Sequence, residues 1–365
     1  MSEIPGMPST AEDTNAADGL LESLSGPARA ELLAIARPVS FSKDAVLLRQ
    51  GTPTRGAYLL RSGTVEVSVR LPGGEALAVA EIPAGGVLGE MALLERGTCS
   101  ATVTAGTPVA ALFIPREEFR LLVARHSTAA ITLQHTVTRN LCAKLATLNA
   151  RLLAYPAPED APYHPPLSID PLTDWPRLHS TSFDYQAFLP ALPFFAEWEA
   201  EAIEELLAHT QLLELPRGQA LFYEGMPATA CYITVRGAVE VQAATALFAV
   251  GEERLQHLRR LAILGPGHLL GYRSLLDVEP EPQSVRARAR ETTLLLELPR
   301  PAFLALYQGT TQAALRLQAT VHAELLQSMA HTNVTLSRLV NLARLHTARR
   351  ADLEAALVEQ AAYAS

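Results

Sequence analysis

Cysteine, basic side chains and long apolar runs are all scarce in this 365-residue sequence. The three cysteines lie far apart and form no CxxC pair, which excludes a disulfide scaffold and a thiolate zinc site and is typical of a reducing compartment. No apolar run approaches the roughly 18 residues that a membrane span needs. The N-terminal MSEIP lacks the basic and apolar regions of a signal peptide. We therefore expect a cytoplasmic protein without membrane segments.

Basic side chains are outnumbered by acidic ones. The chain has 30 lysines and arginines against 38 aspartates and glutamates, which gives a net charge of −8 and a pI near 5.7. Proteins that coat nucleic acid usually carry a basic surplus. The residues after Phe303 also lack the pattern of a helix, a glycine turn and a basic recognition helix. We therefore expect no DNA binding.

Short motifs of common enzyme classes are absent as well. The sequence has no HxH pair of histidine ligands, no P-loop and no GxSxG nucleophile elbow. These absences disfavour catalysis and a resident metal ion, so the prediction is a non-catalytic protein.

The length of 365 residues predicts about two domains, and a hydrophobic content of 48% is enough for sizeable cores. Residues 39–114 contain short β-forming runs separated by glycines, which is typical of a barrel or sandwich. Residues 116–153 lack glycine and proline, and leucines recur there at a 4-3-4 spacing. This spacing predicts a long amphipathic helix. The leucines are Leu141, Leu145, Leu148 and Leu152.

The two halves of the sequence resemble each other. Residues 51–58 (GTPTRGAY) match residues 225–232 (GMPATACY), and each is followed by a glycine and a VEV run, all at an offset of 174 residues. Residues 85–89 (GGVLG) match residues 267–271 (GHLLG) at an offset of 182, so the second copy carries an eight-residue insertion. The chain is therefore predicted to hold two copies of one β-rich module, each followed by a helix.

The expected domain boundaries follow from this repeat and from proline content. Seven prolines lie between residues 156 and 176, which no helix or central strand could absorb. That stretch is either an extended spacer or a segment that docks on one of the modules. The predicted parts are a disordered tail (1–18), a first module with its helix (19–153), a proline-rich linker (154–186), a second module (187–335) and a helical tail (336–365).

The repeated pattern, together with residues 89–103 (GEMALLERGTCSATV), resembles the cyclic-nucleotide-binding domain of catabolite-activator-type transcription factors and kinase A regulatory subunits. The resemblance covers about residues 20–150 and 188–335. It implies a mainly β fold with flanking α-helices: two cupin-like β-rolls (double-stranded β-helices), each followed by a long helix. It also implies cAMP or cGMP as the candidate ligand.

The resemblance further implies a phosphate cassette, Gly-Glu-x-Ala-Leu…Arg-Ser/Thr-Ala. In that family the N–H groups at the start of a short helix face the phosphate, the glutamate accepts from the ribose hydroxyl, and the arginine pairs with phosphate oxygens. The candidate ligand-binding residues of the first module are Gly89, Glu90, Met91, Ala92, Arg96, Cys99, Ser100 and Ala101. The corresponding residues of the second, degenerate module are Gly271, Tyr272, Gln283 and Ser284.

Neither module keeps the arginine, because Cys99 and Gln283 stand in its place, and Tyr272 stands at the second glutamate position. Loss of one partner of a desolvated charge pair typically costs about 2–5 kcal/mol, or about 30-fold to several thousandfold in affinity. The sequence thus predicts at most weak nucleotide binding in the first module and still less in the second.

Three residues of the first cassette have two interpretations each. Arg96 is either a replacement for the missing arginine or a solvated loop residue. Glu90 is either the ribose ligand or an acid favoured by the helix dipole. Cys99 is either a redox switch or a small apolar residue of the pocket, and the lack of an adjacent basic residue or resolving cysteine favours the latter.

The predicted function is that of a regulatory or adaptor protein in which the helices repack and pass a signal to a partner protein. The alternative is a structural scaffold whose pockets bind no nucleotide. The leucines of the first long helix, and Leu325, Met329, Leu336 and Val340 of the second, either bury against their own barrel or form a homodimer seam.

One strand of the second module carries a basic stripe. Arg286, Arg288 and Arg290 alternate with small residues and are expected on the outside of the barrel. They either dock an acidic partner or form a solvated face beside Glu279, Glu281 and Glu291. The high alanine, leucine and arginine content indicates a GC-rich bacterial gene.

Overall fold

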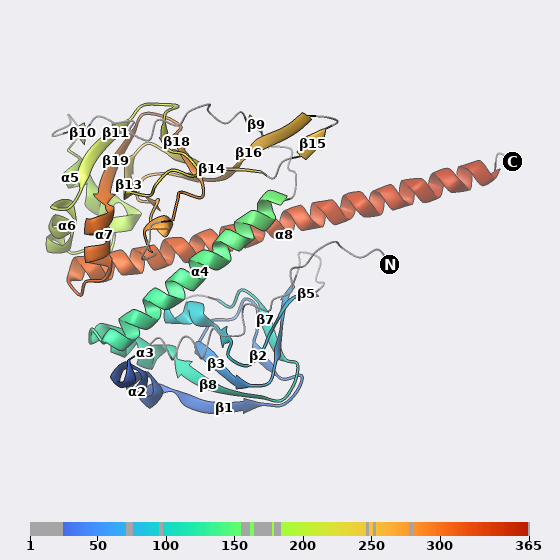
Figure 1. Cartoon of the computed structure of the whole chain (residues 1–365), viewed down its shortest axis with the longest axis horizontal. Coiled ribbons are helices and arrows are strands. Elements are labelled where there is room, and N and C mark those ends of the chain that lie inside the picture. Colours follow the sequence, from blue (N-terminus) through green and yellow to red (C-terminus); the bar gives the residue numbers. More distant parts are fainter. Residues whose placement is uncertain are drawn as a thin grey trace. The chain divides into compact units, whose positions relative to one another are not determined.

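The computed structural model describes residues 25–70, 76–94, 98–154, 161–163, 177–178, 184–245, 248–250, 253–276 and 281–363 (Figure 1). The chain divides into two compact units, Met1–Leu141 and Cys142–Ser365. This division falls inside helix α4 (Thr128–Ala154), so the chain passes from one unit to the next within a continuous helix. The expected tail (1–18) lies outside the described residues.

The first unit contains a roll of two four-stranded antiparallel sheets, which we call the first roll. One sheet has the order β1-β8-β3-β6 and the other β2-β7-β4-β5. The strands are β1 (Arg37–Phe41), β2 (Val46–Leu48), β3 (Gly56–Ser62), β4 (Val65–Arg70), β5 (Ala76–Ile82), β6 (Val87–Leu88), β7 (Thr102–Ala105) and β8 (Val109–Pro115).

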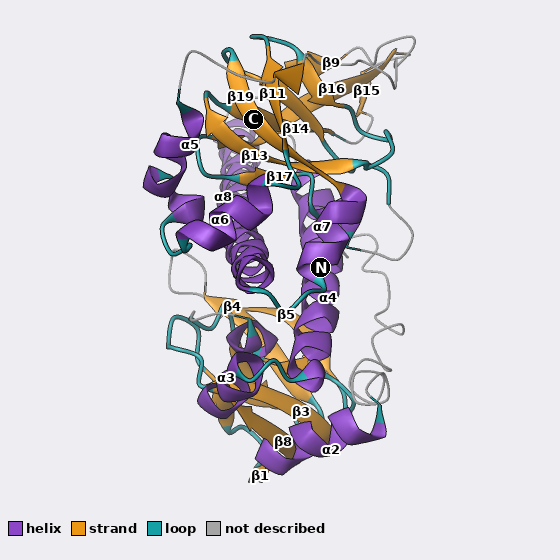
Figure 2. Ribbon diagram, turned by 90° about the vertical axis from the view of Figure 1, so that its left-hand side faces the viewer, coloured by secondary structure: helices purple, strands orange, loops and turns teal. Residues whose placement is uncertain are grey.

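Apolar side chains from both sheets meet inside the first roll. Leu60, Val65, Leu88 and Val103 belong to this interior cluster and are at most 5% exposed. The helices of the unit are α2 (Gly26–Ile35), the 3₁₀ turn η2 (Glu90–Leu93), α3 (Arg116–Ala124) and the first part of α4. Helix α3 lies against β3 and β8 (Figure 2).

The second unit contains a second roll with more strands. Its sheets have the orders β10-β11-β19-β13-β17 and β12-β18-β14-β16-β15. The strands are β10 (Arg177–Leu178), β11 (Gln211–Leu215), β12 (Ala220–Phe222), β13 (Ala230–Arg236), β14 (Val239–Ala244), β15 (Phe248–Val250), β16 (Glu253–Leu264), β17 (Leu269–Leu270), β18 (Arg286–Ala289) and β19 (Thr293–Pro299).

The helices of the second unit gather on one side of this roll (Figure 2). A core of apolar residues joins them to β13 and β19, and it includes Phe195, Leu206, Phe303 and Leu317. The helical elements are α5 (Tyr185–Phe188), η3 (Leu189–Ala191), η4 (Pro193–Phe195), α6 (Ala200–Leu207), η5 (Arg273–Leu275), α7 (Arg300–Tyr307) and α8 (Gln312–Tyr363). Helix α8 continues without a break past residue 336, where the helical tail was expected to begin.

The predicted repeat is confirmed strand by strand. The sheet order β1-β8-β3-β6 recurs as β11-β19-β13-β17, and β2-β7-β4-β5 recurs as β12-β18-β14-β16. The register shift between Leu60 and Ser62 has its counterpart between Thr234 and Arg236, 174 residues later. The expected fold class, two β-rolls each followed by a long helix, is therefore confirmed.

The insertion and the proline-rich segment both add strands to the second roll. The insertion lies at the β14–β16 hairpin, where β15 pairs with an extended β16. In the proline-rich segment, β9 (Ala161–Tyr163) pairs with β16, and β10 pairs with β11. Docking on a module is thus the alternative that the described parts of this segment support.

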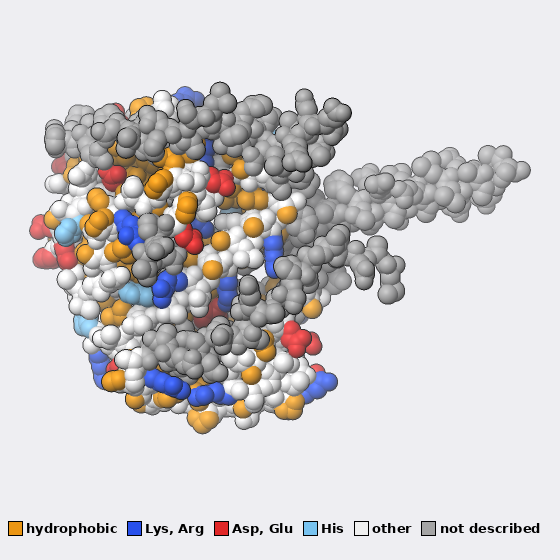
Figure 3. All heavy atoms as spheres, in the orientation of Figure 1, with side chains coloured by type: hydrophobic (Ala, Val, Ile, Leu, Met, Phe, Trp, Pro, Cys, Tyr) orange, Lys and Arg blue, Asp and Glu red, His pale blue; other side chains and the backbone are white. Residues whose placement is uncertain are grey.

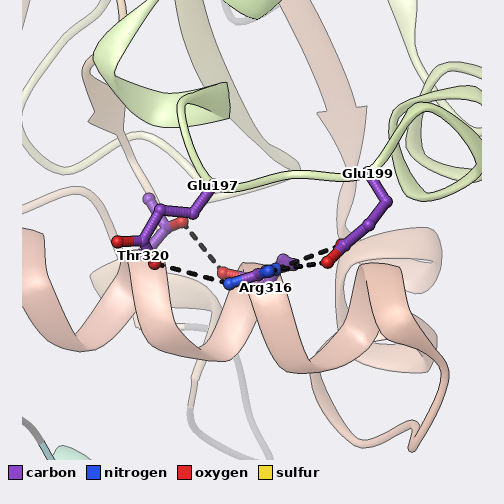
Figure 4. A network of polar contacts seen from close by, with 4 residues as sticks. All are labelled: Glu197, Glu199, Arg316 and Thr320. Carbon is purple, nitrogen blue, oxygen red and sulfur yellow. Dashed lines mark hydrogen bonds and ion pairs between the residues drawn. The ribbon is translucent and has the colours of Figure 1, made fainter.

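An ionic network holds α8 against the chain that leads into α6. Arg316 of α8 reaches both Glu199 and Glu197, with nitrogen–oxygen distances of 2.7 and 3.4 Å (Figure 4). The hydrogen bond from Arg316 lowers the pKa of the Glu199 carboxyl. The Thr320 hydroxyl donates to the Arg316 carbonyl, one turn earlier on the same helix (Figure 4).

The leucine stripes are largely buried within the chain. Leu141, Leu145 and Leu152 of α4 are at most 3% exposed, and Leu325 and Met329 of α8 are also buried. This supports intramolecular packing over a homodimer seam for these positions. The side chain of Val340 lies outside the described residues.

Charged side chains of both signs are interspersed on the face of the molecule in Figure 3. Among the described residues, no helix is long and apolar enough to cross a membrane. The described part of the chain also holds no group of three or more histidine, cysteine, aspartate or glutamate side chains suited to a metal ion.

Candidate functional site

The cassette of the first roll begins at a glycine that the backbone requires. Gly89 has φ +66° and precedes the 3₁₀ turn Glu90–Leu93. A β-carbon on Gly89 would lie 2.8 Å from the Gly56 carbonyl oxygen, so neither the backbone angle nor the space suits another residue. The turn is closed by a bond from the Ala92 N–H to the Gly89 carbonyl. N–H groups at the start of such a turn lack partners within it and suit an anion.

Cys99, the residue at the family's arginine position, lies on a loop that is fixed by backbone hydrogen bonds. Gly51 N–H donates to the Cys99 carbonyl at 2.9 Å, and Cys99 N–H donates to the Thr52 carbonyl at 2.8 Å. Cys99 is 7% exposed. Burial raises the pKa of the Tyr58 phenol, the nearby Cys99 thiol adds to the rise, and Arg55 opposes it. Cys99 and the exposed Arg55 therefore act on the pKa of Tyr58 in opposite directions.

The interior of the first roll is lined by side chains that are only partly buried. Leu48, Tyr58, Val67 and Ile82 are half-buried and pack against the interior cluster. Tyr58 also contacts the Phe113 ring, with centroids 4.8 Å apart.

The other predicted residues of the first site differ in how deeply they are buried. Glu90 and Met91 are half-buried, so Glu90 is not a fully solvated acid. Ala92 is buried, Ser100 is exposed and Ala101 is half-buried. Arg96 lies outside the described residues, so its predicted role as a replacement arginine stays a prediction.

A buried glutamine connects the cassette to α4. Gln134, 7% exposed, donates from its side-chain amide to the Leu93 carbonyl at 2.9 Å, at the end of the cassette turn. All of these residues belong to the first unit. Gln134 was not among the predicted site residues, because a single glutamine on a helix gives no pattern in the sequence. The repeat could have identified it: the residue 184 positions later is also a glutamine, Gln318.

The cassette of the second roll has a different arrangement. Gly271 keeps its positive φ of +79° and precedes the turn Arg273–Leu275. Tyr272, which stands in place of the glutamate, is 5% exposed and belongs to the cluster that contains Phe303 and Leu317 of α7 and α8. Burial holds the pKa of its phenol well above the ordinary range. The Tyr272 side chain thus packs in the core between the helices and the sheet, and not in the interior of the roll.

Gln283 repeats the backbone pairing of Cys99. Its carbonyl accepts from Gly225 N–H at 2.7 Å and its N–H donates to the Met226 carbonyl at 2.8 Å. It is 5% exposed, whereas Ser284 is exposed.

Larger side chains are buried inside the second roll than inside the first. Phe222 and Tyr232 stand where the first roll has Leu48 and Tyr58. They are 6% and 8% exposed, and their rings stack with centroids 6.2 Å apart.

Among the described residues, Gln318 binds the end of α7 and no part of the second cassette. Its amide donates to the Tyr307 carbonyl at 2.7 Å and to the Gly309 carbonyl at 3.1 Å, at the end of α7. The repeat therefore keeps this glutamine but uses it differently in the two rolls.

The basic stripe lies on the outer face of the second roll, as parity predicted. Arg288 and Arg290 lie 3.8 and 3.4 Å from a carboxylate oxygen of Glu240, a residue that is itself only 4% exposed. The Arg286 guanidinium lies over the Tyr223 ring, 5.0 Å from its centroid. The expected neighbour Glu279 lies outside the described residues.

Comparison with known sequences identifies the family of both rolls. The family described as "Cyclic nucleotide-binding domain" matches residues 38–126 and 212–310, just over half of the chain. A stretch of 133 residues is 36% identical to Glutaminase 1 of Bradyrhizobium diazoefficiens, covering 36% of this chain and 21% of that protein. A stretch of 130 residues is 37% identical to the cyclic AMP receptor protein of Thermus thermophilus, covering 35% of this chain and 54% of that protein. The chain therefore aligns with about half or less of the length of these relatives.

Two solved structures align with most of this chain. One is the regulatory domain of Toxoplasma gondii PKA with cAMP, which is 18% identical, with 81% of this chain and 90% of that chain covered and a TM-score of 0.28. The other is the regulatory subunit of a cAMP-independent protein kinase A from Trypanosoma brucei, which is 16% identical, with coverage of 83% and 91% and a TM-score of 0.28.

Proposed function

The chain belongs to the cyclic nucleotide-binding domain family, and from this premise we propose that it is a non-catalytic regulatory protein of the cytoplasm with one working nucleotide site. The site is in the first roll and takes a cyclic nucleotide, cAMP or cGMP, with low affinity. The signal leaves through α4 and reaches a protein partner. The domain boundaries proposed are those expected above, with the first module ending in α4 and the second continuing into α8.

The observation that carries this proposal is the bond between Gln134 and the cassette. A nucleotide phosphate at the N–H groups after Gly89 would reposition the turn Glu90–Leu93. The Leu93 carbonyl at the end of that turn is the acceptor for Gln134, so a shift of the turn reaches α4 through one buried hydrogen bond. If the turn moved without Gln134, a buried polar group would lose its partner, which costs about 1–3 kcal/mol. This cost favours a movement of α4 together with the cassette turn.

Low affinity follows from the chemistry of position 99. A cyclic nucleotide carries a diester anion that the family pairs with a guanidinium, and Cys99 supplies no charge. The cations available to compensate are Arg55, whose charge acts on Tyr58, and Arg96.

The second roll is proposed to bind no nucleotide. Tyr272 faces the helical core, and the interior holds the stacked rings of Phe222 and Tyr232. If the first roll also fails to bind, the alternative function is a structural scaffold, and the replacement of the family's arginine by the buried Cys99 favours that alternative.

Thermal unfolding of the full chain with added nucleotide tests the proposal. A ligand at about 100 times its Kd stabilises the folded state by about 2.7 kcal/mol. We expect a rise in Tm with cAMP or cGMP, no rise with 5′-AMP, and loss of the rise in Glu90→Ala. No rise with millimolar cAMP or cGMP would leave the scaffold function.

A further inference from the structure

A buried arginine points into the interior of the second roll from a strand outside the cassette. Arg259 lies on β16 directly across from Ala243 of β14. Cross-strand partners share a face of the sheet, and Ala243 belongs to the interior cluster of this roll. Arg259 is 3% exposed. A guanidinium with so little access to water needs acceptors from the protein.

The last turn of α4 supplies such an acceptor. Arg259 Nη1 donates to the Leu152 carbonyl, two residues before the end of the helix, and Leu152 is 3% exposed. The final carbonyls of a helix lack partners within it and carry the negative end of its dipole, so they suit a guanidinium. The next residue, Leu153, packs against the interior cluster of the second roll.

The chain on both sides of this turn is attached to the same unit. Before it, the Thr332 hydroxyl of α8 donates to the Asn149 side chain at 3.1 Å. After it, β9 pairs with β16, and Ala161 lies across from Leu258, the neighbour of Arg259. The turn is therefore held from both ends as well as by its own contacts.

We propose that the interior of the second roll is a binding site for a helix C-terminus, occupied by the last turn of α4 (Arg151–Ala154) of the same chain. Arg259 anchors the helix carbonyls and Leu153 fills the apolar part of the site. The occupant is a peptide turn with a partial negative charge, in place of a nucleotide. This assignment holds whether or not the first roll binds a cyclic nucleotide.

Hydrogen exchange of the full chain, followed by mass spectrometry, tests the proposal. Arg259→Met removes the guanidinium and keeps an unbranched apolar side chain in place of the arginine stem. Its matched control is Arg260→Met, because Arg260 is exposed and pairs with Gln242 on the opposite face. We expect amide exchange in residues 149–154 to accelerate at least about tenfold in Arg259→Met and to be unchanged in Arg260→Met. Equal exchange in the two variants, with the rest of the unit protected as in the wild type, would overturn the proposal.

A second variant covers the case in which Arg259→Met unfolds the whole unit, recognised by lost protection in α7. Leu153→Ala removes the apolar contact and leaves the guanidinium, and Arg151→Ala is its control because Arg151 is exposed. Faster exchange confined to residues 149–154 in Leu153→Ala supports the proposal. Exchange there that matches Arg151→Ala contradicts it.

Discussion

Gly89 lies so close to Gly56 that a β-carbon at residue 89 would stand 2.8 Å from the Gly56 carbonyl oxygen. The cassette turn therefore rests directly on strand β3, and its position is fixed by a backbone contact. We predict that Gly89→Ala destabilises the first unit by more than the roughly 1–2 kcal/mol that a left-handed backbone costs a non-glycine residue, and that it weakens nucleotide binding.

Gly51→Ala is the control for this prediction. Gly51 has a similar φ of +79°, but nothing lies within 4 Å of a β-carbon there. Urea unfolding should show the smaller loss for Gly51→Ala. Equal losses would mean that the close approach to Gly56 has no energetic consequence.

Restoring the family's arginine should increase the cyclic nucleotide affinity of the first roll only. Cys99→Arg places a guanidinium beside the interior that Tyr58 lines, and we predict tighter cyclic nucleotide binding by about 30-fold or more. Gln283→Arg should give no binding, because Tyr272 packs in the helical core and two stacked aromatic rings are buried in the second interior. Fluorescent nucleotide titration measures both. A gain in Gln283→Arg, or none in Cys99→Arg, would contradict this view of the two sites.

Substitution of Gln134 should block the response of α4 to nucleotide without abolishing nucleotide binding. Gln134→Leu removes the bond to the Leu93 carbonyl, so we expect nucleotide to bind within a few-fold of the wild-type Kd without changing hydrogen exchange in residues 128–141 of α4. In Gln318→Leu the nucleotide response of α4 should persist, because Gln318 binds the end of α7. A preserved response in Gln134→Leu would show that the signal takes another route.

The His268–Glu324 pair should make the stability of the second unit depend on pH. The hydrogen bond from Nδ1 of His268 to Glu324, 3.0 Å long, raises the pKa of the imidazole, although partial burial opposes the rise. A raised folded-state pKa means that the pair contributes fully below the ordinary histidine pKa of about 6.5 and that its contribution is lost as pH rises through the folded-state value.

The stability difference between wild type and His268→Asn should therefore shrink as pH increases from 5.5 to 8.5. Chemical unfolding at several pH values measures this difference. Glu324→Gln is the control, since it removes the carboxylate and with it the predicted trend. A difference that grows with pH would mean that the imidazole is stabilised in its neutral form.

Much of the fold could be predicted from the sequence, because glycine turns and β-forming runs recur at a fixed offset. Gly51 and Gly225 have positive φ in both copies, and the same strands follow them. The repeated glycine turns and β-forming runs reflect the backbone conformation, and the two rolls have the same backbone conformation.

The use of each site could not be predicted in the same way. The sequence shows that Tyr272 replaces a glutamate, but only packing reveals that its ring joins the core around Phe303. Gln134 and Arg259 are single polar residues, and their partners, the Leu93 and Leu152 carbonyls, are backbone groups that no residue type identifies. The position of the proline-rich segment depends on strand pairing with β16, which composition alone does not encode.

The number of nucleotide sites per chain can be measured by calorimetric titration of the full chain with cAMP and cGMP. We expect one weak site per chain, lost in Glu90→Ala and kept in Glu81→Ala, where an exposed acid on β5 is removed. Two sites per chain, or a single site that survives Glu90→Ala, would mean that the first cassette is not the one working site.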